Sequence, residues 1–351
     1  MKEVAIKDIC QKDSSALKQK ELLSEGKYPV FGASGIAGYL NIFHQKKEYI
    51  GIVKDGSGIG RVAFYPPESS LIGTMQYILP KEDFDIRYIG YCLQSLDLSK
   101  YKQGAAIPHI YFRDYGERLV RVSDNKEEQR SIVTRLDTAF SHIDALKANA
   151  EKQLNEARKL FQAELTECMK PKEGWEEKTL PKLSENLDSI RKPVTKKDRT
   201  EGIYPYYGAS GIVDYVDNYL FDEDLLCISE DGANLLMRTY PIAFPISGKA
   251  WVNNHAHVLR FKCMSTQRYV EYYFAGLKLD EYITGAAQPK LTQKALNSII
   301  ISIPSSLAEQ SSIVAHLDSL SSNIRKLEEL QQKTIVECDA LKQAMLREVF
   351  E

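Results

Sequence analysis

Two stretches of the sequence carry apolar side chains in a helical repeat. In residues 126–170 these side chains recur at alternating spacings of four and three, and residues 306–351 keep the same register. A spacing that averages 3.5 residues aligns the side chains in one seam, which is typical of helices that pack along their length. The positions predicted to pack helix against helix are Ile132, Leu136, Ile143, Leu146, Ile313, Leu317, Leu320, Ile324, Leu327 and Leu341.

Both stretches open with helix signals. Asn125-x-x-Glu128 and Ser306-x-x-Glu309 are capping-box patterns, and Pro171 with Gly174 predicts the end of the first helix. About 44 residues at 1.5 Å each give a rod of roughly 65 Å. We expect the two helices to pack against each other. The alternative is that each apolar stripe packs on its own globular domain.

The segments that precede the helices have a mixed pattern of strands and turns. Tyr49–Val53 and Arg61–Phe64 read as two strands joined by a glycine-rich turn. In the second segment the corresponding strands are expected at Leu225–Ser229 and Leu235–Tyr240. The predicted fold class is α/β (α+β), with two similar globular domains separated by two long coiled-coil helices and related by a pseudo-twofold internal repeat.

The chain contains an internal duplication. Residues 28–40 and 204–216 share eight of 13 positions at an offset of 176, and both contain Gly-Ala-Ser-Gly-Ile. Residues 127–146 and 308–327 share ten of 20 positions at an offset of 181. Gly-Ala-Ala-x-Pro appears at 104–108 and again at 285–289. The order of segments is therefore domain, helix, domain, helix.

The composition favours a soluble cytoplasmic protein. Of the 351 residues, 43% are hydrophobic and 27% are charged, which argues against wholesale disorder. The sequence has neither an apolar signal core nor the roughly 18–20 apolar residues that a membrane span needs. The six cysteines form no CxxC pair, which disfavours both a disulfide scaffold and a structural zinc site. The formal charge of −2 excludes a globally basic nucleic-acid binder but allows local basic surfaces.

Motifs for catalysis and metal binding are missing from the sequence. Gly56–Gly60 resembles a nucleotide-binding loop, but a strand follows it where the dinucleotide fingerprint requires a helix. There is no Asn/Asp-Pro-Pro-Phe/Tyr motif, which argues against adenine methylation by this chain, and no GxSxG motif. His255 and His257 are expected to be a structural pair rather than metal ligands. We therefore predict no catalytic residue and no metal site.

The remaining polar chemistry points to DNA. Lysine and arginine neutralise phosphates, and lysine, arginine, glutamine and asparagine read base edges in the major groove. The Gly-Ala-Ser-Gly-Ile segments favour a tight turn over a phosphate-binding nest. The candidate DNA contacts are Lys18, Lys20, Ser34, Lys54, Arg61, Lys102, Gln103, His109, Arg113, Arg191, Lys192, Lys196, Lys197, Arg199, Ser210, Arg238, Lys249, Gln288, Lys290 and Lys294.

The duplicated order of these motifs resembles the specificity (S) subunit of type I restriction-modification systems. The matching features are the paired Tyr-Pro and Gly-Ala-Ser-Gly-Ile motifs, Gly285–Pro289 followed by Leu291, and the Glu-Gln-x-x-Ile-Val openings of both helices. Ile303-Pro304 leads into the second helix, as is usual in the family. The first copy uses Val122–Asn125 without that proline, so its joint to the helix can differ in angle.

The resemblance implies a domain plan and a function. It implies target recognition domains at 1–125 and 171–305, and antiparallel spacer helices at 126–170 and 306–351. Each domain would read one half of a bipartite asymmetric double-stranded DNA site. Two methyltransferase (M) subunits and a restriction and translocation (R) subunit would supply catalysis, with S-adenosylmethionine, ATP and Mg²⁺ bound to those partners and no cofactor on this chain.

Two other functions remain open at this point. One is a non-DNA scaffold that presents two protein-binding domains on a paired-helix spacer, against which the basic stretch at 191–199 argues weakly. The other is a self-contained enzyme, such as a fused methyltransferase-nuclease, against which the missing catalytic motifs and the modest length argue.

Overall fold

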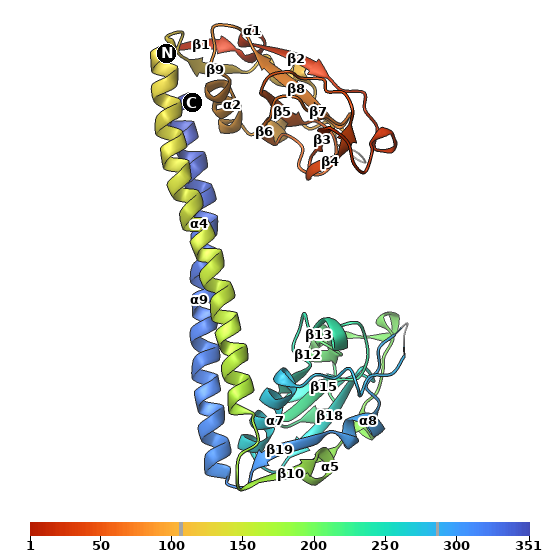
Figure 1. Cartoon of the computed structure of the whole chain (residues 1–351). Coiled ribbons are helices and arrows are strands. Elements are labelled where there is room, and N and C mark those ends of the chain that lie inside the picture. The colour runs from red at the N-terminus through yellow and green to blue at the C-terminus, as the bar shows by residue number, and fades with distance from the viewer. Residues whose placement is uncertain (105–107, 286–287) are drawn as a thin grey trace. The chain divides into compact units, whose positions relative to one another are not determined.

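The chain forms two compact units that share the two long helices. A computed structural model describes residues 1–104, 108–285 and 288–351. Unit 1 contains Met1–Lys152 with Gln331–Glu351, and unit 2 contains Gln153–Leu330. Helices α4 (Lys126–Cys168) and α9 (Leu307–Phe350) each contribute residues to both units (Figure 1). The two predicted long helices are therefore confirmed, and α4 ends before Pro171 as expected.

The globular part of unit 1 is built on sheets whose strands pair antiparallel, except for one parallel pair that joins Val30–Phe31 to Ser70–Leu71. Its strands are β1 (Lys2–Ala5), β2 (Cys10–Ser14), β3 (Tyr28–Gly32), β4 (Gly35–Leu40), β5 (Tyr49–Val53), β6 (Val62–Tyr65), β7 (Ser70–Leu71), β8 (Met75–Pro80) and β9 (Leu119–Val122). They form the sheets β2-β8-β5-β6, β4-β3-β7 and β1-β9. The short helices are α1 (Ile6–Ile9), η1 (Gln19–Glu21), α2 (Ile86–Ser95), η2 (Leu98–Tyr101) and α3 (Phe112–Tyr115).

Unit 2 repeats this plan. Its strands are β10 (Trp175–Thr179), β11 (Ser184–Asn186), β12 (Glu201–Gly208), β13 (Gly211–Val216), β14 (Phe221–Asp222), β15 (Leu225–Ser229), β16 (Ala243–Ile246), β17 (Lys249–Val252), β18 (Ala256–Phe261) and β19 (Ile300–Pro304). The sheets β11-β18-β15-β16, β13-β12-β17-β14 and β10-β19 follow the orders of unit 1, with β14 added at one edge. Its helices are α5 (Leu180–Leu183), η3 (Asp188–Ile190), η4 (Lys196–Asp198), α6 (Asn234–Met237), α7 (Met264–Gly276) and α8 (Gln293–Ser298).

One predicted strand is wrong. The hairpin of β5 and β6 is confirmed, but Leu235–Tyr240 is not a strand. Residues 234–237 form the helical turn α6, and β15 pairs instead with β16, which begins at Ala243. Asn234 closes the intervening loop, because its side chain bonds both the amide and the carbonyl of Tyr240. The apolar residues of Leu235–Tyr240 wrongly indicated a strand, because local bonds between side chains and the backbone compete with the hydrogen bonds of a strand ladder.

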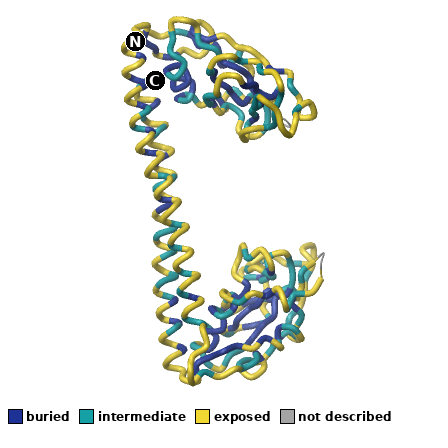
Figure 2. Tube along the Cα trace, in the orientation of Figure 1, coloured by how far each residue is buried: buried dark blue, intermediate teal, exposed yellow. Residues whose placement is uncertain are grey.

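The seam between the helices is part of the core of each unit. Buried positions recur along both long helices (Figure 2). In unit 1, Ile132, Leu136 and Ile143 of α4 belong to one buried cluster with Leu346 and Phe350 of α9. That cluster also contains residues of the globular part. In unit 2, Leu165 of α4 and Val314 and Leu317 of α9 are buried in the same way. Each stripe therefore packs both on its own domain and on the other helix.

Two of the predicted packing residues lie outside the seam. Leu146 is 59% exposed and Leu341 is 51% exposed. The next residue in each helix, Lys147 or Lys342, is half-buried instead. At these two points the side chain that faces the other helix therefore comes one residue later than the leucine. Phe140 is also buried. A lysine can occupy a seam position when its aliphatic stem is covered and its ammonium group reaches an acid.

A buried glutamine fastens each globular domain to the start of its helix. In unit 1 the Gln129 side chain accepts a hydrogen bond from the Asp85 amide at 2.8 Å and donates to the Ser123 carbonyl at 2.8 Å. In unit 2 the Gln310 side chain accepts from Thr266 Oγ1 and donates to the Pro304 carbonyl, both at 2.7 Å. This contact gives a physical reason for the Glu-Gln motif that opens both helices.

Among the described residues, every helix is too short or too polar to cross a lipid bilayer.

Candidate nucleic-acid interface

The Gly-Ala-Ser-Gly-Ile segments are tight turns in both units. They join β3 to β4 and β12 to β13, and Gly35 and Gly211 have φ angles of 116° and 118°, a conformation that favours glycine. Each turn exposes its serine, Ser34 or Ser210. The isoleucines that follow, Ile36 and Ile212, are 56% and 47% exposed rather than packed. The two turns therefore present the same small polar and apolar groups to the solvent.

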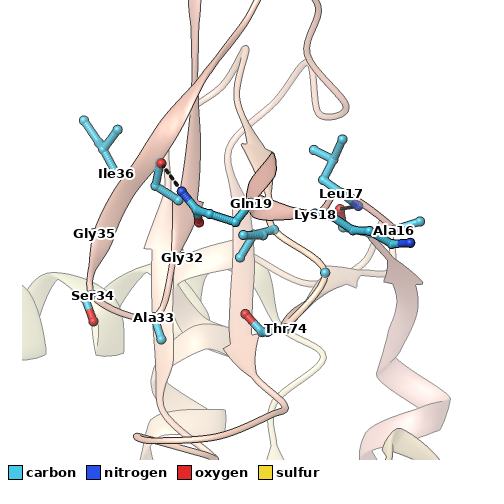
Figure 3. A pocket seen from close by; sticks show the side chains of 14 residues that line it. Ala16, Leu17, Lys18, Gln19, Gly32, Ala33, Ser34, Gly35, Ile36 and Thr74 are labelled. Carbon is cyan, nitrogen blue, oxygen red and sulfur yellow. Dashed lines mark hydrogen bonds between the residues drawn. The ribbon is translucent and has the colours of Figure 1, made fainter. Parts of the chain in front are cut away.

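A groove of about 760 Å³ lies beside the turn in unit 1. Its walls are residues 15–19, 32–37 and 72–74, and the Gln19 side chain donates to the Ala37 carbonyl at 2.9 Å (Figure 3). At the positions equivalent to Ala37 and Thr74, the second copy has Val213 and His255. The duplicated scaffold thus carries larger side chains on the corresponding face of unit 2.

A polar cluster adjoins this groove. The Thr74 carbonyl accepts hydrogen bonds from the amides of Lys54 and Asp55 at 3.0 and 3.2 Å. The carboxylate of Asp55 is hydrogen-bonded to His109 Nδ1, and the imidazole of His109 lies 4.1 Å from the ring of Tyr111. These contacts join the loop after β5 to residues 108–111.

The same surface continues along the segment before α3. The Gln103 amide group donates to Asp114 at 2.8 Å, and the Arg113 guanidinium lies 4.6 Å from the ring centre of Tyr111. Lys102, Gln103 and Arg113 are exposed. A side chain such as Gln103, held by one carboxylate and open to solvent, is suited to exchange that bond for a base edge.

Unit 2 builds an equivalent cluster with a different histidine. Asp231 occupies the position of Asp55, and both of its carboxylate oxygens lie 2.9 Å from His255 Nδ1. His255 precedes β18, whereas His109 comes from the loop before α3. The position of His109 is taken by Lys290, which keeps the same backbone bridges. The backbone frame is shared, and the exposed groups on it differ.

A buried ionic network lies beneath the second cluster. His257 is 1% exposed, its Nδ1 lies 2.6 Å from Asp188 Oδ2, and its Nε2 lies 2.8 Å from the Leu291 carbonyl. Arg191 bonds Glu230 at 2.6 Å, and Lys290 Nζ lies 3.1 Å from the same carboxylate group. The network therefore fixes the segment that presents Lys290.

The network keeps its two acids ionised. Burial opposes the ionised form of Asp188, but the hydrogen bond and charge of His257, the Val258 amide and Arg191 outweigh it and hold the pKa of Asp188 below its usual value. Burial likewise opposes ionisation of Glu230, yet Arg191 and the charge of His257 lower its pKa.

Three of the arginines predicted to contact DNA make contacts within unit 2. The side chain of Arg191 is only 12% exposed and belongs to the network above. Arg199 pairs with Asp214 at 2.9 Å and stacks 4.3 Å from the Tyr206 ring centre. Arg238 donates to the Phe274 and Leu277 carbonyls at the end of α7. The sequence could not reveal these contacts, because it shows the positive charges but not the acceptors that the fold brings to them.

The other predicted contacts lie at the surface or just beneath it. Lys54 and His109 are half-buried. The exposed members are Lys18, Lys20, Ser34, Arg61, Lys102, Gln103, Arg113, Lys192, Lys196, Lys197, Ser210, Lys249, Gln288, Lys290 and Lys294. Residues 105–107 and 286–287 of the two Gly-Ala-Ala-x-Pro motifs lie outside the described residues. Whether the exposed side chains touch DNA stays a prediction.

Two side-chain groups in the described part of the chain have metal-ligand chemistry. The ligand atoms of Asp188, Glu230 and His257 lie within 4.8 Å of one another, but Arg191 and Lys290 already neutralise the two acids. Glu164, Cys168 and His316 form the second group, in which His316 and Glu164 bond across the helix pair at 2.9 Å. His255 and His257 bond two different acids, Asp231 and Asp188, and the expected absence of a metal site stays a prediction.

The sequence matches one family model over most of its length. The model described as "Type I restriction modification DNA specificity domain" matches residues 1–156 and again residues 172–337. A type I restriction enzyme specificity subunit of Haemophilus influenzae is 36% identical over 143 residues, which is 41% of this chain. The match spans 36% of that relative's length.

Solved structures show the same fold. A chain from a study of complex assembly and conformational transition of the type I R-M system aligns with 98% of this chain and 96% of its own length, at a TM-score of 0.73 and 15% identity. The HsdS subunit from Thermoanaerobacter tengcongensis aligns with 98% of this chain and 95% of its own, at a TM-score of 0.55 and 16% identity.

Proposed function

We propose, from the premise that this chain belongs to the family of type I restriction modification DNA specificity domains, that it reads a bipartite asymmetric DNA site. Family members are non-catalytic DNA-recognition components, and this chain is one of them. The residue ranges 1–125 and 171–305 act as the two target recognition domains. The helices 126–170 and 306–351 act as the spacer between the two half-sites.

The observation that carries this proposal is the pair of equivalent frames with different exposed groups. Both units repeat the same turn and the same bridged loops, which supports one mode of docking on DNA. His109 in unit 1 gives way to Lys290 in unit 2, and Ala37 gives way to Val213. Similar docking with different side chains predicts two different half-site sequences, and hence an asymmetric target.

Phosphate contacts and base contacts have separate roles in the proposed mechanism. Exposed lysines such as Lys196 and Lys197 neutralise phosphates and set the position of the protein on the duplex. Gln103 in unit 1 and Gln288 with Lys290 in unit 2 are placed on the bridged loops, where they approach base edges. The buried network around His257 holds the second of these loops in place.

The chemistry of modification belongs to partner proteins in this proposal. Two methyltransferase subunits dock beside the helices and carry S-adenosylmethionine, and each target adenine leaves the stack to reach their active sites. A restriction and translocation subunit supplies ATP- and Mg²⁺-dependent cleavage. This chain contributes no cofactor and determines where the partners act.

Methylation sequencing of cells that express this chain with its methyltransferase partner tests the proposal. We expect one split motif with two unrelated halves and a fixed gap. Replacement of Gln103 by Ala is expected to relax one half only, and replacement of Gln288 by Ala the other half only. A continuous motif, or methylation at the same sites without this chain, would contradict the proposal.

The scaffold alternative predicts a different result in a binding assay. DNA binding by the complex of this chain with the methyltransferase should weaken steeply as salt rises, because phosphate contacts release counterions. A protein scaffold would show no salt-dependent DNA binding beyond that of the methyltransferase alone.

A further inference from the structure

Acidic and basic side chains link the two long helices in each unit. In unit 1, Lys147 Nζ of α4 lies 2.8 Å from a carboxylate oxygen of Asp339 on α9. In unit 2, Arg158 Nε of α4 lies 2.8 Å from Glu328 Oε1 on α9. In both pairs the cation belongs to α4 and the anion belongs to α9.

The internal repeat makes these two pairs equivalent. Helices α4 and α9 begin at residues 126 and 307, which differ by the same 181 residues as the repeated helix sequences. Under this offset Lys147 corresponds to Glu328, and Arg158 corresponds to Asp339. The same contact therefore occurs in both units. At equivalent positions of the repeat, however, the charge is positive on α4 and negative on α9.

The exchange has a consequence for any pairing of identical helices. If a second α4 replaced α9, Arg158 would stand where Asp339 stands and would face Lys147. If a second α9 replaced α4, Glu328 would face Asp339 in the same way. Each contact occurs twice in a symmetric pair, so both identical pairings would bring like charges together, which destabilises helix pairs.

A third ion pair adds to this preference. Lys342 Nζ of α9 lies 2.5 Å from Asp144 of α4. The α9 residue equivalent to Asp144 is Arg325, so a pair of α9 helices would place Arg325 against Lys342. The attraction in the observed pair would become a third repulsion.

The charged seam positions are partly sheltered from solvent. The side chains of Lys147 and Glu328 are 30% and 36% exposed, and the two residues occupy the same place in the repeat. Charges at seam positions of paired helices set the choice of partner more than they raise stability.

We propose that these exchanged charges select the pairing of α4 with α9 of the same chain and disfavour a second copy of the chain as a pairing partner. The identical apolar register of the two helices permits all three pairings. The charges distinguish them, so that the duplicated helices assemble within one chain instead of between chains.

Three variants that leave the net charge unchanged separate these pairings. R158E with E328K keeps both α4–α9 pairs opposite in charge but also brings opposite charges together at these positions in both identical pairings. R158E with D339K makes both of these α4–α9 pairs repulsive and brings opposite charges together at the same positions in the identical pairings. The fourfold variant K147E/R158E/E328K/D339K inverts all four charges of the two equivalent pairs, so it restores the native preferences at these positions and is the matched control.

The mass of each refolded full-length chain, measured by light scattering over a range of concentrations, reports the partner choice. We expect R158E/E328K to dimerise with a dissociation constant on the order of tenfold lower than that of the native chain, while its melting temperature stays close to native. R158E/D339K should dimerise and also melt at a lower temperature. The fourfold variant should behave as the native chain does.

Two results would overturn the proposal. One is an equal dimer fraction for R158E/E328K, the native chain and the fourfold variant at low salt. The other is dimerisation of the fourfold variant as strong as that of R158E/E328K, because loss of native residues rather than charge selection would then be the cause. If R158E/E328K does not fold, K147E/D339K tests the same switch at the other ion pair.

Discussion

At the scale of single residues, burial decides which charged side chains hold the fold and which remain available to a partner. Arg191 and Lys196 are five positions apart in one basic run, yet Arg191 is held by Asp188 and Glu230 while Lys196 is exposed. The sequence shows the charges but not their acceptors. Arg191 donates to Glu230 and to the Ala256 carbonyl, which are distant in the sequence and are brought to it by the folding of the sheet. Candidate contacts chosen by charge alone therefore mix both kinds.

Removing two exposed lysines should change DNA affinity without changing the fold. For K196A/K197A we expect the slope of log affinity against log salt to become shallower by about two, since each lost phosphate contact releases about one fewer counterion. The melting temperature should stay within a degree or two of the native value. R191A is the comparison: a large drop in its melting temperature would mark a structural arginine.

The buried acids make unit 2 sensitive to low pH. Because the folded-state pKa values of Asp188 and Glu230 lie below their usual values, their contribution to stability is present above about pH 4 and is lost as pH falls through the folded values. Melting curves from pH 6 to pH 3 should show a loss of stability that is smaller in D188N. An equal loss in D188N and the native chain would exclude this cause.

At the scale of helices and strands, local sequence signals predicted most of the architecture. The two long helices, the glycine turns and the β5–β6 hairpin follow from spacing, caps and turn residues. The strand expected at 235–240 failed because the Asn234 side chain bonds the amide and the carbonyl of Tyr240, which a strand ladder would need. The seam was misplaced by one residue at Leu146 and Leu341, because hydrophobicity gives no sign that a lysine stem fills a seam position.

Gln129 and Gln310, in the first turn of the two long helices, should stabilise the contact between each helix and its globular domain. We expect Q129A and Q310A each to lower the free energy of unfolding by about 1–3 kcal/mol, because the buried backbone groups that they bind lose their partners. Urea denaturation measures this change. E127A, which removes an exposed side chain two residues before Gln129, is a matched control and should change stability by less than about 0.5 kcal/mol.

At the scale of the whole molecule, the proposed function requires the two recognition domains to work independently. Exchange of residues 1–125 for the first domain of another family member should change one half-site and leave the other intact. Methylation sequencing of the exchanged protein with its partner reads both halves at once. A change in both halves would show that the domains do not read DNA separately.

The spacer proposal makes a second prediction about the whole molecule. Insertion of one heptad into α4 and one into the facing part of α9 keeps the seam in register, so both half-sites should be kept while the gap between them lengthens. Insertion of five residues in each helix is the control, because five residues add about 1.4 turns and rotate the seam away from the partner helix. An unchanged gap after the heptad insertions would contradict a spacer role.

Unit 1 is assembled from two segments that lie on either side of unit 2 in the sequence, and this has a consequence for biosynthesis. Its buried cluster needs Leu346 and Phe350, whose ring lies 5.1 Å from that of Tyr88. On the ribosome, the first domain would emerge long before these residues exist. The part of the apolar face of α4 that packs on α9 must then stay uncovered while all of unit 2 is translated, which would make it a binding site for chaperones that bind nascent chains.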